Sequence, residues 1–207
     1  MLRYLAAVLL SVPLASPGGA TEIAAEFNLD VAMSSFASFG AAGPVSARGQ
    51  SFTAEVSGRV ESVGLRVSRT SDHALKLRIS ILRVGEDGKP TGSPILVGDF
   101  PGSLIPVDSD GEAVIFPFEN GPMLEAGVRY ALTFRPTAYL QTETPFYING
   151  AVNADASYEG GMAMRSADNG DTWTLVQVID FGFRVTVAET VPVDLVSWGS
   201  LKRVATR

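Results

Sequence analysis

The chain of 207 residues contains no cysteine and only one histidine, His73. Without cysteine the chain forms no disulfides, so its fold must rest on a buried core. Zinc sites in proteins are built mainly from cysteine and histidine side chains, and one imidazole cannot make such a site. The composition therefore excludes a disulfide scaffold and a zinc site.

Positive charge is also scarce. The chain has 16 Lys and Arg against 22 Asp and Glu, a formal net charge of −6, and its basic residues are not clustered. Nucleic-acid binding needs Lys and Arg gathered on one face to neutralise phosphates, so nucleic acid is not expected as a partner. After residue 20 no apolar run reaches the roughly 20 residues that a membrane-spanning helix needs, so the mature chain is expected to have no transmembrane segment.

The first twenty residues have the three parts of a secretory signal peptide. Arg3 is followed by an uncharged stretch over 4–14 and by small and turn-forming residues that end at Ala20. A buried N-terminal helix is the alternative, but Pro13 and Pro17 disfavour it. We therefore predict a signal peptide over 1–20 and a secreted, extracellular or cell-envelope protein with a net charge of −7. Export without disulfides fits a bacterial protein best.

The rest of the chain alternates apolar and polar residues with a period of two. Alternation of this kind gives each strand one buried and one wet face, as in packed antiparallel sheets. The inward rows are Val63, Leu65 and Val67; Leu75, Leu77, Ile79 and Ile81; Val128, Tyr130, Leu132 and Phe134; and Phe181, Phe183, Val185 and Val187. We predict an all-β, antiparallel two-sheet β-sandwich over 21–188, followed by a C-terminal tail over 189–207.

Turn sequences such as Asp110-Gly111 and Asn149-Gly150 divide the predicted strands at the short spacing of an all-β domain. Because the connections between strands look non-local, a jelly roll is favoured over a meander. The predicted strands cover 29–36, 49–56, 59–69, 74–84, 94–100, 112–118, 127–135, 145–149, 161–166, 173–178 and 180–188.

The C-terminal tail allows two interpretations. Pro192 interrupts strand continuation, and the last residues include Lys202, Arg203 and Arg207. The tail can be a frayed terminus that docks Trp198, or it can be a sorting or attachment signal. The first is favoured, because no long apolar run precedes the basic end as a membrane-anchoring signal requires.

Residues 166–173 fit the Asp-box pattern S-x-D-x-G-x-T-W. Ser166 and Asp168 can bond to the backbone of a turn, Gly170 accepts a positive φ, and Trp173 can pack beneath the loop. The motif is similar to the Asp boxes of sialidases and related propellers. Those proteins repeat the box, whereas this chain has one box and no repeat of blade length. We therefore interpret the box as a structural hairpin turn.

The box lies within a longer order of motifs that resembles the exported bacterial β-sandwich modules called choice-of-anchor domains. The motifs are Gly49-Gln50-Ser51-Phe52-Thr53-Ala54, Gly58-Arg59-Val60-Glu61-Ser62-Val63-Gly64-Leu65, Leu124-Glu125-Ala126-Gly127-Val128-Arg129-Tyr130-Ala131-Leu132, Tyr158-Glu159-Gly160-Gly161-Met162-Ala163, and Asp180-Phe181-Gly182-Phe183-Arg184-Val185. The resemblance covers about residues 29–188. It implies a jelly-roll fold like that of carbohydrate-binding modules, on a surface or secreted protein.

No catalytic constellation is visible, and we do not expect an enzyme. His73 lies in a predicted turn, and no nucleophile-elbow spacing supplies it with a serine. Paired carboxylates could hydrolyse glycosides, but scattered surface acids are the default on an acidic protein. The acids considered are Asp108, Asp110, Glu112, Asp155, Glu159 and Asp180.

A structural Ca²⁺ ion is the one metal that the sequence allows, and no other cofactor is expected. Asp108, Asp110 and Glu112 place oxygen ligands at alternating positions around a turn glycine, which suits a cation that takes six to eight oxygens. The segment lacks a full EF-hand loop, so a polar hairpin turn is favoured. The turn over 168–171 is a second, weaker candidate.

Three tyrosines, Tyr139, Tyr147 and Tyr158, are the candidate ligand-binding residues. They lie in the region 136–160, where alternation weakens, and aromatic rings can stack on the apolar faces of sugars. The alternative is that Phe146 and Tyr158 pack into the core beside Trp173.

Three functions remain open. The favoured one is a non-catalytic surface or secreted module that binds a glycan or another envelope component. The second is a structural protein that assembles into an extracellular layer or filament. The third and least favoured is an extracellular hydrolase. The fold alone does not choose among them.

Overall fold

The computed structural model describes residues 20–30, 35–39, 46–107, 112–138, 144–152 and 158–189, with the backbone alone for 35–39 and Glu189. Apart from the short 3-10 helix η1 (Gly102–Leu104), the regular structure of these residues is β. The strands are β1 (Thr21–Phe27), β2 (Ser35–Phe39), β3 (Ala47–Thr53), β4 (Gly58–Arg69), β5 (Lys76–Val84), β6 (Pro90–Pro101), β7 (Glu112–Pro117), β8 (Met123–Leu124), β9 (Arg129–Pro136), β10 (Phe146–Val152), β11 (Ala163–Ser166), β12 (Thr174–Val176), β13 (Ile179–Phe181) and β14 (Phe183–Glu189).

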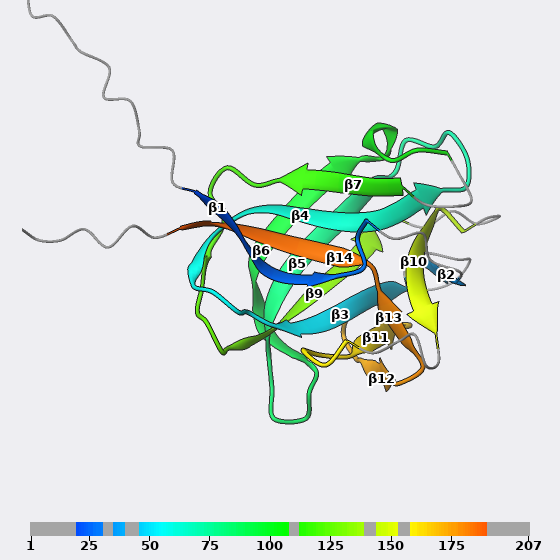
Figure 1. Ribbon diagram of the computed structural model, residues 1–207. Coiled ribbons are helices and arrows are strands. Elements are labelled where there is room, and N and C mark those ends of the chain that lie inside the picture. The colour runs from blue at the N-terminus through cyan, green and yellow to red at the C-terminus, as the bar shows by residue number, and fades with distance from the viewer. Residues whose placement is uncertain are drawn as a thin grey trace, which may run out of the picture.

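The strands form two antiparallel sheets packed as a β-sandwich (Figure 1), which confirms the predicted fold class. Sheet A has the order β1-β14-β4-β10-β13, with β7 and β8 also paired to β4 and β2 paired to β10. Sheet B has the order β12-β11-β3-β9-β5-β6. Among the described strands, only β5–β6 and β11–β12 are neighbours both in sequence and in a sheet. The other pairings are non-local.

The core lies between the two sheets and is built from the alternating apolar rows. Leu65 of β4 and Ile79 of β5 are fully buried, as the period-two pattern predicts. Aromatic rings join the layers: the Phe52 ring of sheet B lies 5.9 Å from the Phe183 ring of sheet A. Burial of these side chains supplies most of the stability of a sandwich that has no disulfide.

The predicted strand 29–36 is wrong at its start, where residues 29 and 30 form a turn; residues 31–34 lie outside the described residues, and 35 and 36 belong to β2. The chain instead forms β1 over Thr21–Phe27 and then turns at Asn28, which has a φ of 46°. Leu29 leaves the strand and is buried over Gly64 of β4, where an added Cβ would lie 2.6 Å from the Leu29 side chain. The absence of a side chain at Gly64 therefore makes room for Leu29.

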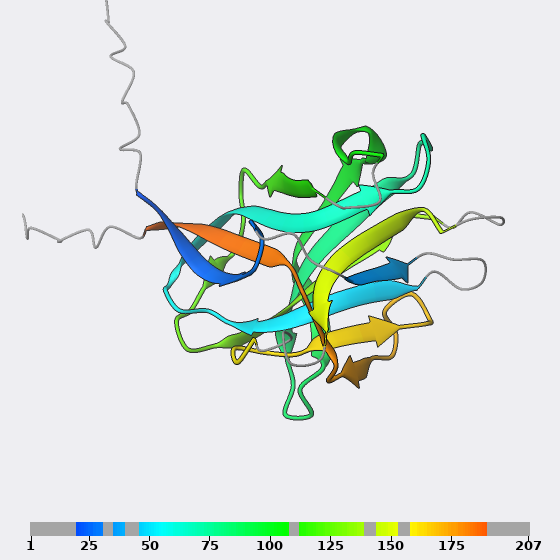
Figure 2. The same cartoon turned by 45° about the vertical axis from the view of Figure 1, so that its right-hand side comes forward.

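The first and last strands pair with each other. Thr21 of β1 is the register partner of Ala188 of β14, so both ends of the described sandwich lie at the same edge (Figure 2). The predicted signal peptide, apart from Ala20, and the predicted tail from residue 190 lie outside the described residues. Within the described part of the chain, no helix is both long enough and apolar enough to cross a bilayer.

Candidate functional site

A continuous row of side chains crosses the outer face of sheet B. Arg78 pairs with Arg135 on one side and with Asp99 on the other, and Ser166 pairs with Ala47. Arg48 pairs with Phe134, which faces the core. The next pair in this register, Ala47 and Arg135, therefore lies on the outer face. From β12 to β6 the row reads Trp173, Ser166, Ala47, Arg135, Arg78 and Asp99.

This row crosses a groove of about 230 Å³. The middle of its floor carries small side chains, among them Ser80 and Thr133, which are only 7% and 8% exposed although they lie on the outer face. One wall is made by Trp173 and the Asp-box turn, and the other by residues of β6 that include Pro94 and Val97. The groove forms because small side chains on its floor lie between larger side chains at its two sides.

The Asp box holds Trp173 at the groove. Ser166 Oγ donates to Asp168 Oδ1 at 2.7 Å and accepts the Gly170 amide at 2.8 Å. Thr172 donates to the Asp168 carboxylate through its amide at 2.9 Å and its hydroxyl at 2.5 Å. These bonds close the hairpin between β11 and β12. The Trp173 ring lies beside Gly170 and is half-buried.

The backbone and charge of the box explain its stability. Asn169 and Gly170 have positive φ values of 65° and 98°, which asparagine and glycine tolerate best. Hydrogen bonds from Thr172 and Ser166 favour the ionised carboxylate and lower the pKa of Asp168 to about 2. At neutral pH the turn is therefore organised around a fixed negative charge.

The charged side chains in the row are arranged by specific contacts. Arg78 binds Asp99 through two hydrogen bonds of 2.6 and 2.7 Å, which raise the pKa of Arg78 and lower the pKa of Asp99. Arg135 donates to the side-chain oxygen of Asn169. Burial and the nearby charge of Arg78 lower the pKa of Arg135. The groove thus presents oriented donors and acceptors beside an indole ring.

The structure does not bring the predicted tyrosines together. Tyr139 lies outside the described residues. Tyr147 lies on β10, between Ser38 of β2 and Ser68 of β4 in the register. Tyr158 packs on the core, with its ring 5.7 Å from Phe27 and 5.3 Å from Phe183. Burial, followed by the charge of the nearby Glu55, raises the pKa of Tyr158 to about 12.

Trp173 does not lie beside these rings. Phe146 is fully buried in the core, whereas Trp173 lies on the outer face of sheet B. Phe146 belongs to β10 of sheet A and Trp173 flanks β12 of sheet B, so the two rings lie in different parts of the sandwich. The expectation that they share a core cluster with Tyr158 holds for Phe146 and Tyr158 but not for Trp173.

Two of the predicted calcium ligands, Asp108 and Asp110, lie outside the described residues. The third, Glu112, is exposed at the start of β7. Within the described ranges, no group of three or more His, Cys, Asp or Glu side chains is placed to hold a metal ion.

Two of the residues considered for catalysis, His73 and Asp180, make contacts that hold the fold together. The His73 ring Nε2 lies 2.8 Å from the Pro145 carbonyl oxygen, and the ring stands edge-on to Phe146. Asp180 is buried and accepts hydrogen bonds from Gln50 and from the Tyr158 amide. Glu159 is exposed, and Asp155 lies outside the described residues.

Sequence reasoning missed Arg78, Arg135 and Asp99 as site residues. Alternation shows that they face outward, but only the register across β12, β11, β3, β9, β5 and β6 shows that they form one row with Trp173. No protein-family model matches the sequence, and no curated protein matches it. The geometry of the groove is therefore the basis for assigning a role to this chain.

Proposed function

We propose that this protein is an exported, non-catalytic surface module that binds a glycan in the outer groove of sheet B. The observation that carries the proposal is the half-buried ring of Trp173 standing beside a row of oriented hydrogen-bonding groups over a floor of small side chains. Ligand sites combine an apolar surface with a few placed polar groups in this way.

The chemistry of the groove matches the two sides of a sugar. A pyranose ring has an apolar C–H face that packs on an indole and a rim of hydroxyl groups that exchange hydrogen bonds. Arg135 and Arg78 supply donors, and Asp99 supplies an acceptor. Because these charged groups already contact neighbouring side chains, they are held in place before a sugar arrives, which lowers the entropic cost of binding.

Two features of the sequence also support the proposal. The pattern over 1–20 is that of a signal peptide, and the order of motifs over 29–188 resembles choice-of-anchor domains. An exported sandwich that resembles carbohydrate-binding modules meets polysaccharides of the envelope or matrix, and a non-catalytic binding role fits that setting. On this proposal the module attaches its protein, or its cell, to a neutral polymer.

Binding to an array of neutral glycans, followed by titration calorimetry with the best oligosaccharide, tests the proposal. Val97→Lys places a longer side chain in the groove at a position that is 51% exposed, so it blocks the groove without disturbing the core. Trp173→Ala removes the stacking surface. Ile115→Ala is the control, because Ile115 is also 51% exposed but lies on the outer face of sheet A.

We expect Val97→Lys and Trp173→Ala to weaken binding at least tenfold and Ile115→Ala to leave it unchanged. Equal binding by all three variants would place the glycan elsewhere. Release of smaller sugars would instead show a hydrolase. Binding to no glycan, together with concentration-dependent growth in light scattering, would favour an assembly protein.

A further inference from the structure

The hairpin between β5 and β6 reaches across sheet B to β12. The register of β5 and β6 shifts between Ile81 and Arg83, and a shift of this kind bends a hairpin. The turn over 85–89 then lies beside β12 (Figure 1, Figure 2), where a Cβ added at Gly88 would be 3.5 Å from Leu175 Cδ1. Because β11, β3 and β9 lie between β12 and β5 in the sheet, the hairpin makes this contact over a face of the sheet.

Leu175 faces the outer side of sheet B, which is the side of the groove. It is the register partner of Met164, and Met164 is the partner of Gly49. Gly49 in turn pairs with Thr133, which lines the groove. Register partners point to the same face, so all four lie on the outer side. Met164 is nevertheless fully buried, which shows that this part of the outer face is covered.

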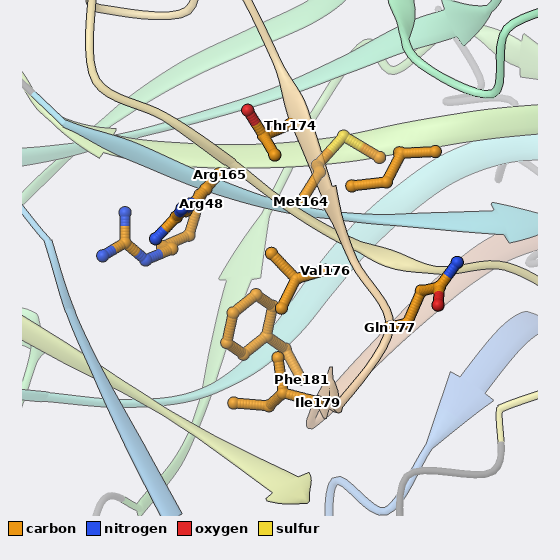
Figure 3. Close-up of a pocket in the computed structure, with 9 residues that line it drawn as sticks. Arg48, Met164, Arg165, Thr174, Val176, Gln177, Ile179 and Phe181 are labelled. Carbon is orange, nitrogen blue, oxygen red and sulfur yellow. The ribbon is translucent and has the colours of Figure 1, made fainter. Parts of the chain in front are cut away.

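The groove does not continue past the contact between the turn and Leu175. Met164 and Leu175 line a separate hollow of about 510 Å³ beside β11, β12 and β13 (Figure 3). Arg48 and Arg165, which pair in the β3–β11 register, line the same hollow. No described residue lines both this hollow and the groove. The hairpin therefore closes one end of the groove.

The groove runs along β5 from an open end to the end that the hairpin closes. Arg78, Ser80 and Leu82 are alternate residues of β5, and all three line it. Leu82 leads into the hairpin, whereas Arg78 and its partner Asp99 lie at the opposite end with side chains 34% and 33% exposed. A bound chain therefore has one way out, past Arg78 and Asp99.

The groove is also small. Its volume of about 230 Å³ lies below the roughly 300–1,000 Å³ that is typical of sites for drug-sized ligands. Trp173 is the one aromatic residue among the described residues that line it, so it offers a stacking surface for one sugar ring. These dimensions suit a single sugar unit and not a run of several units.

We propose that the groove binds the terminal sugar of a glycan chain, with the sugar ring on Trp173 and the rest of the chain leaving past Arg78 and Asp99. This inference rests on the proposed glycan-binding function and narrows it to chain ends. An internal sugar carries a linkage on two sides, and one of the two would meet the hairpin. Binding should therefore scale with the number of chain ends and not with the mass of the polymer.

Titration calorimetry with neutral oligosaccharides of increasing length tests the proposal. The probes are the di-, tetra- and hexasaccharides of four linear series, namely α-1,4-glucose, β-1,4-glucose, β-1,4-mannose and β-1,4-N-acetylglucosamine. With the full chain, we expect binding at one site and affinities within about threefold of each other across the lengths of a series. A rise of about tenfold or more from disaccharide to hexasaccharide would overturn end recognition.

A shortened hairpin tests whether the turn is what closes the groove. Replacing 85–89 with Asn-Gly keeps the pairing of Val84 with Pro90 and makes a two-residue turn that lacks the contact with Leu175. We expect this variant to bind the hexasaccharide at least about threefold more tightly than the disaccharide, because the closed end is opened. Glu86→Ala, at an exposed position of the same turn, is the matched control and should keep equal affinities. Equal affinities in the shortened variant would overturn the role of the hairpin.

The outcomes separate this inference from the glycan proposal. Affinity that rises with length but is lost in Val97→Lys would keep the groove as the glycan site and overturn end recognition. Affinities that are equal across lengths and unchanged in Val97→Lys would place the bound chain end outside the groove and overturn the assignment. Binding of none of the four series would count against both proposals.

Discussion

Gln50 of β3 joins the two sheets through Asp180 of β13. Its side-chain nitrogen donates to Asp180 Oδ1 at 2.9 Å, and its side-chain oxygen accepts the Phe181 amide at 3.1 Å. The second oxygen of Asp180 accepts the Tyr158 amide at 3.2 Å. Gln50 is fully buried and Asp180 nearly so. The bridge thus links sheet B to sheet A inside a largely apolar core.

Gln50→Ala should lower the free energy of unfolding by about 2–4 kcal/mol, because it removes the buried hydrogen bonds that Gln50 makes to Asp180 Oδ1 and to the Phe181 amide. Urea denaturation followed by circular dichroism measures the change. Gln177→Ala is the control, since Gln177 is exposed. A loss below 1 kcal/mol for Gln50→Ala would show that the bridge contributes little to the stability of the sandwich.

The sequence predicts where Gln50 lies but not what it does. It falls in the predicted strand 49–56, two residues before Phe52, so alternation places both side chains on the inward face. A polar residue in an inward row signals a buried hydrogen bond, since an unpaired one is costly. Its partner is 130 residues away, and period-two patterns contain no information about which strands of opposite sheets face each other.

Because a sequence pattern does not show which strands pair, neither the groove nor the pairing of Arg48 with Arg165 could be predicted. The outward positions of Arg78 and Arg135 follow from alternation, and the Asp box is visible as a motif. The row needs the β5–β9 register, and the pairing of Arg48 with Arg165 needs the β3–β11 register. Both are set by contacts distant in the sequence. The misplaced first strand has the same origin, because β1 is defined by pairing with β14 at the other end of the chain.

Acid should loosen the Asp-box hairpin. The folded pKa of Asp168 is lowered to about 2, below the ordinary value of 3.8, so its contribution to stability is complete above about pH 4 and is lost as the pH falls towards 2. The protection factors for amide hydrogen exchange at Gly170 and Thr172, taken relative to the intrinsic exchange rate at each pH, should therefore fall over this window. Asp168→Asn, which does not titrate, should exchange faster at neutral pH and show no such step. An identical pH profile for both proteins would contradict this account.

Gly161→Ala should be severely destabilising. A Cβ at this position would lie 1.8 Å from the Ser51 carbonyl oxygen, a backbone atom that is tied to β3 and cannot move freely. We expect a loss of about 3 kcal/mol or more, measured by urea denaturation.

Gly92→Ala gives the matched comparison for Gly161→Ala. Gly92 has a φ of 70° but no atom within 4 Å of an added Cβ, so only backbone strain of about 1 kcal/mol is expected. Similar losses at the two positions would show that close packing at Gly161 does not limit the fold.

Tyr158→Ala should destabilise the protein by about 2–3 kcal/mol without weakening glycan binding. The ring packs against Phe27 and Phe183, so its removal leaves a gap between β1 and β14 at the edge of the core. Tyr158→Phe keeps the ring and should cost less than 1 kcal/mol at neutral pH. Urea denaturation and calorimetry with the oligosaccharide that the native chain binds measure the two effects separately.

Alkaline pH separates the roles of the ring and the hydroxyl of Tyr158. Because burial raises the folded pKa to about 12 from an ordinary value of 10.0, ionisation is resisted in the native state, and stability should fall as the pH rises from about 10 to 12. Tyr158→Phe has no phenol to ionise, so this part of the alkaline loss should disappear. Tyr158→Ala could instead abolish glycan binding while the free energy of unfolding stays constant. That result would make Tyr158 a ligand contact, and the groove beside Trp173 would not be the glycan site.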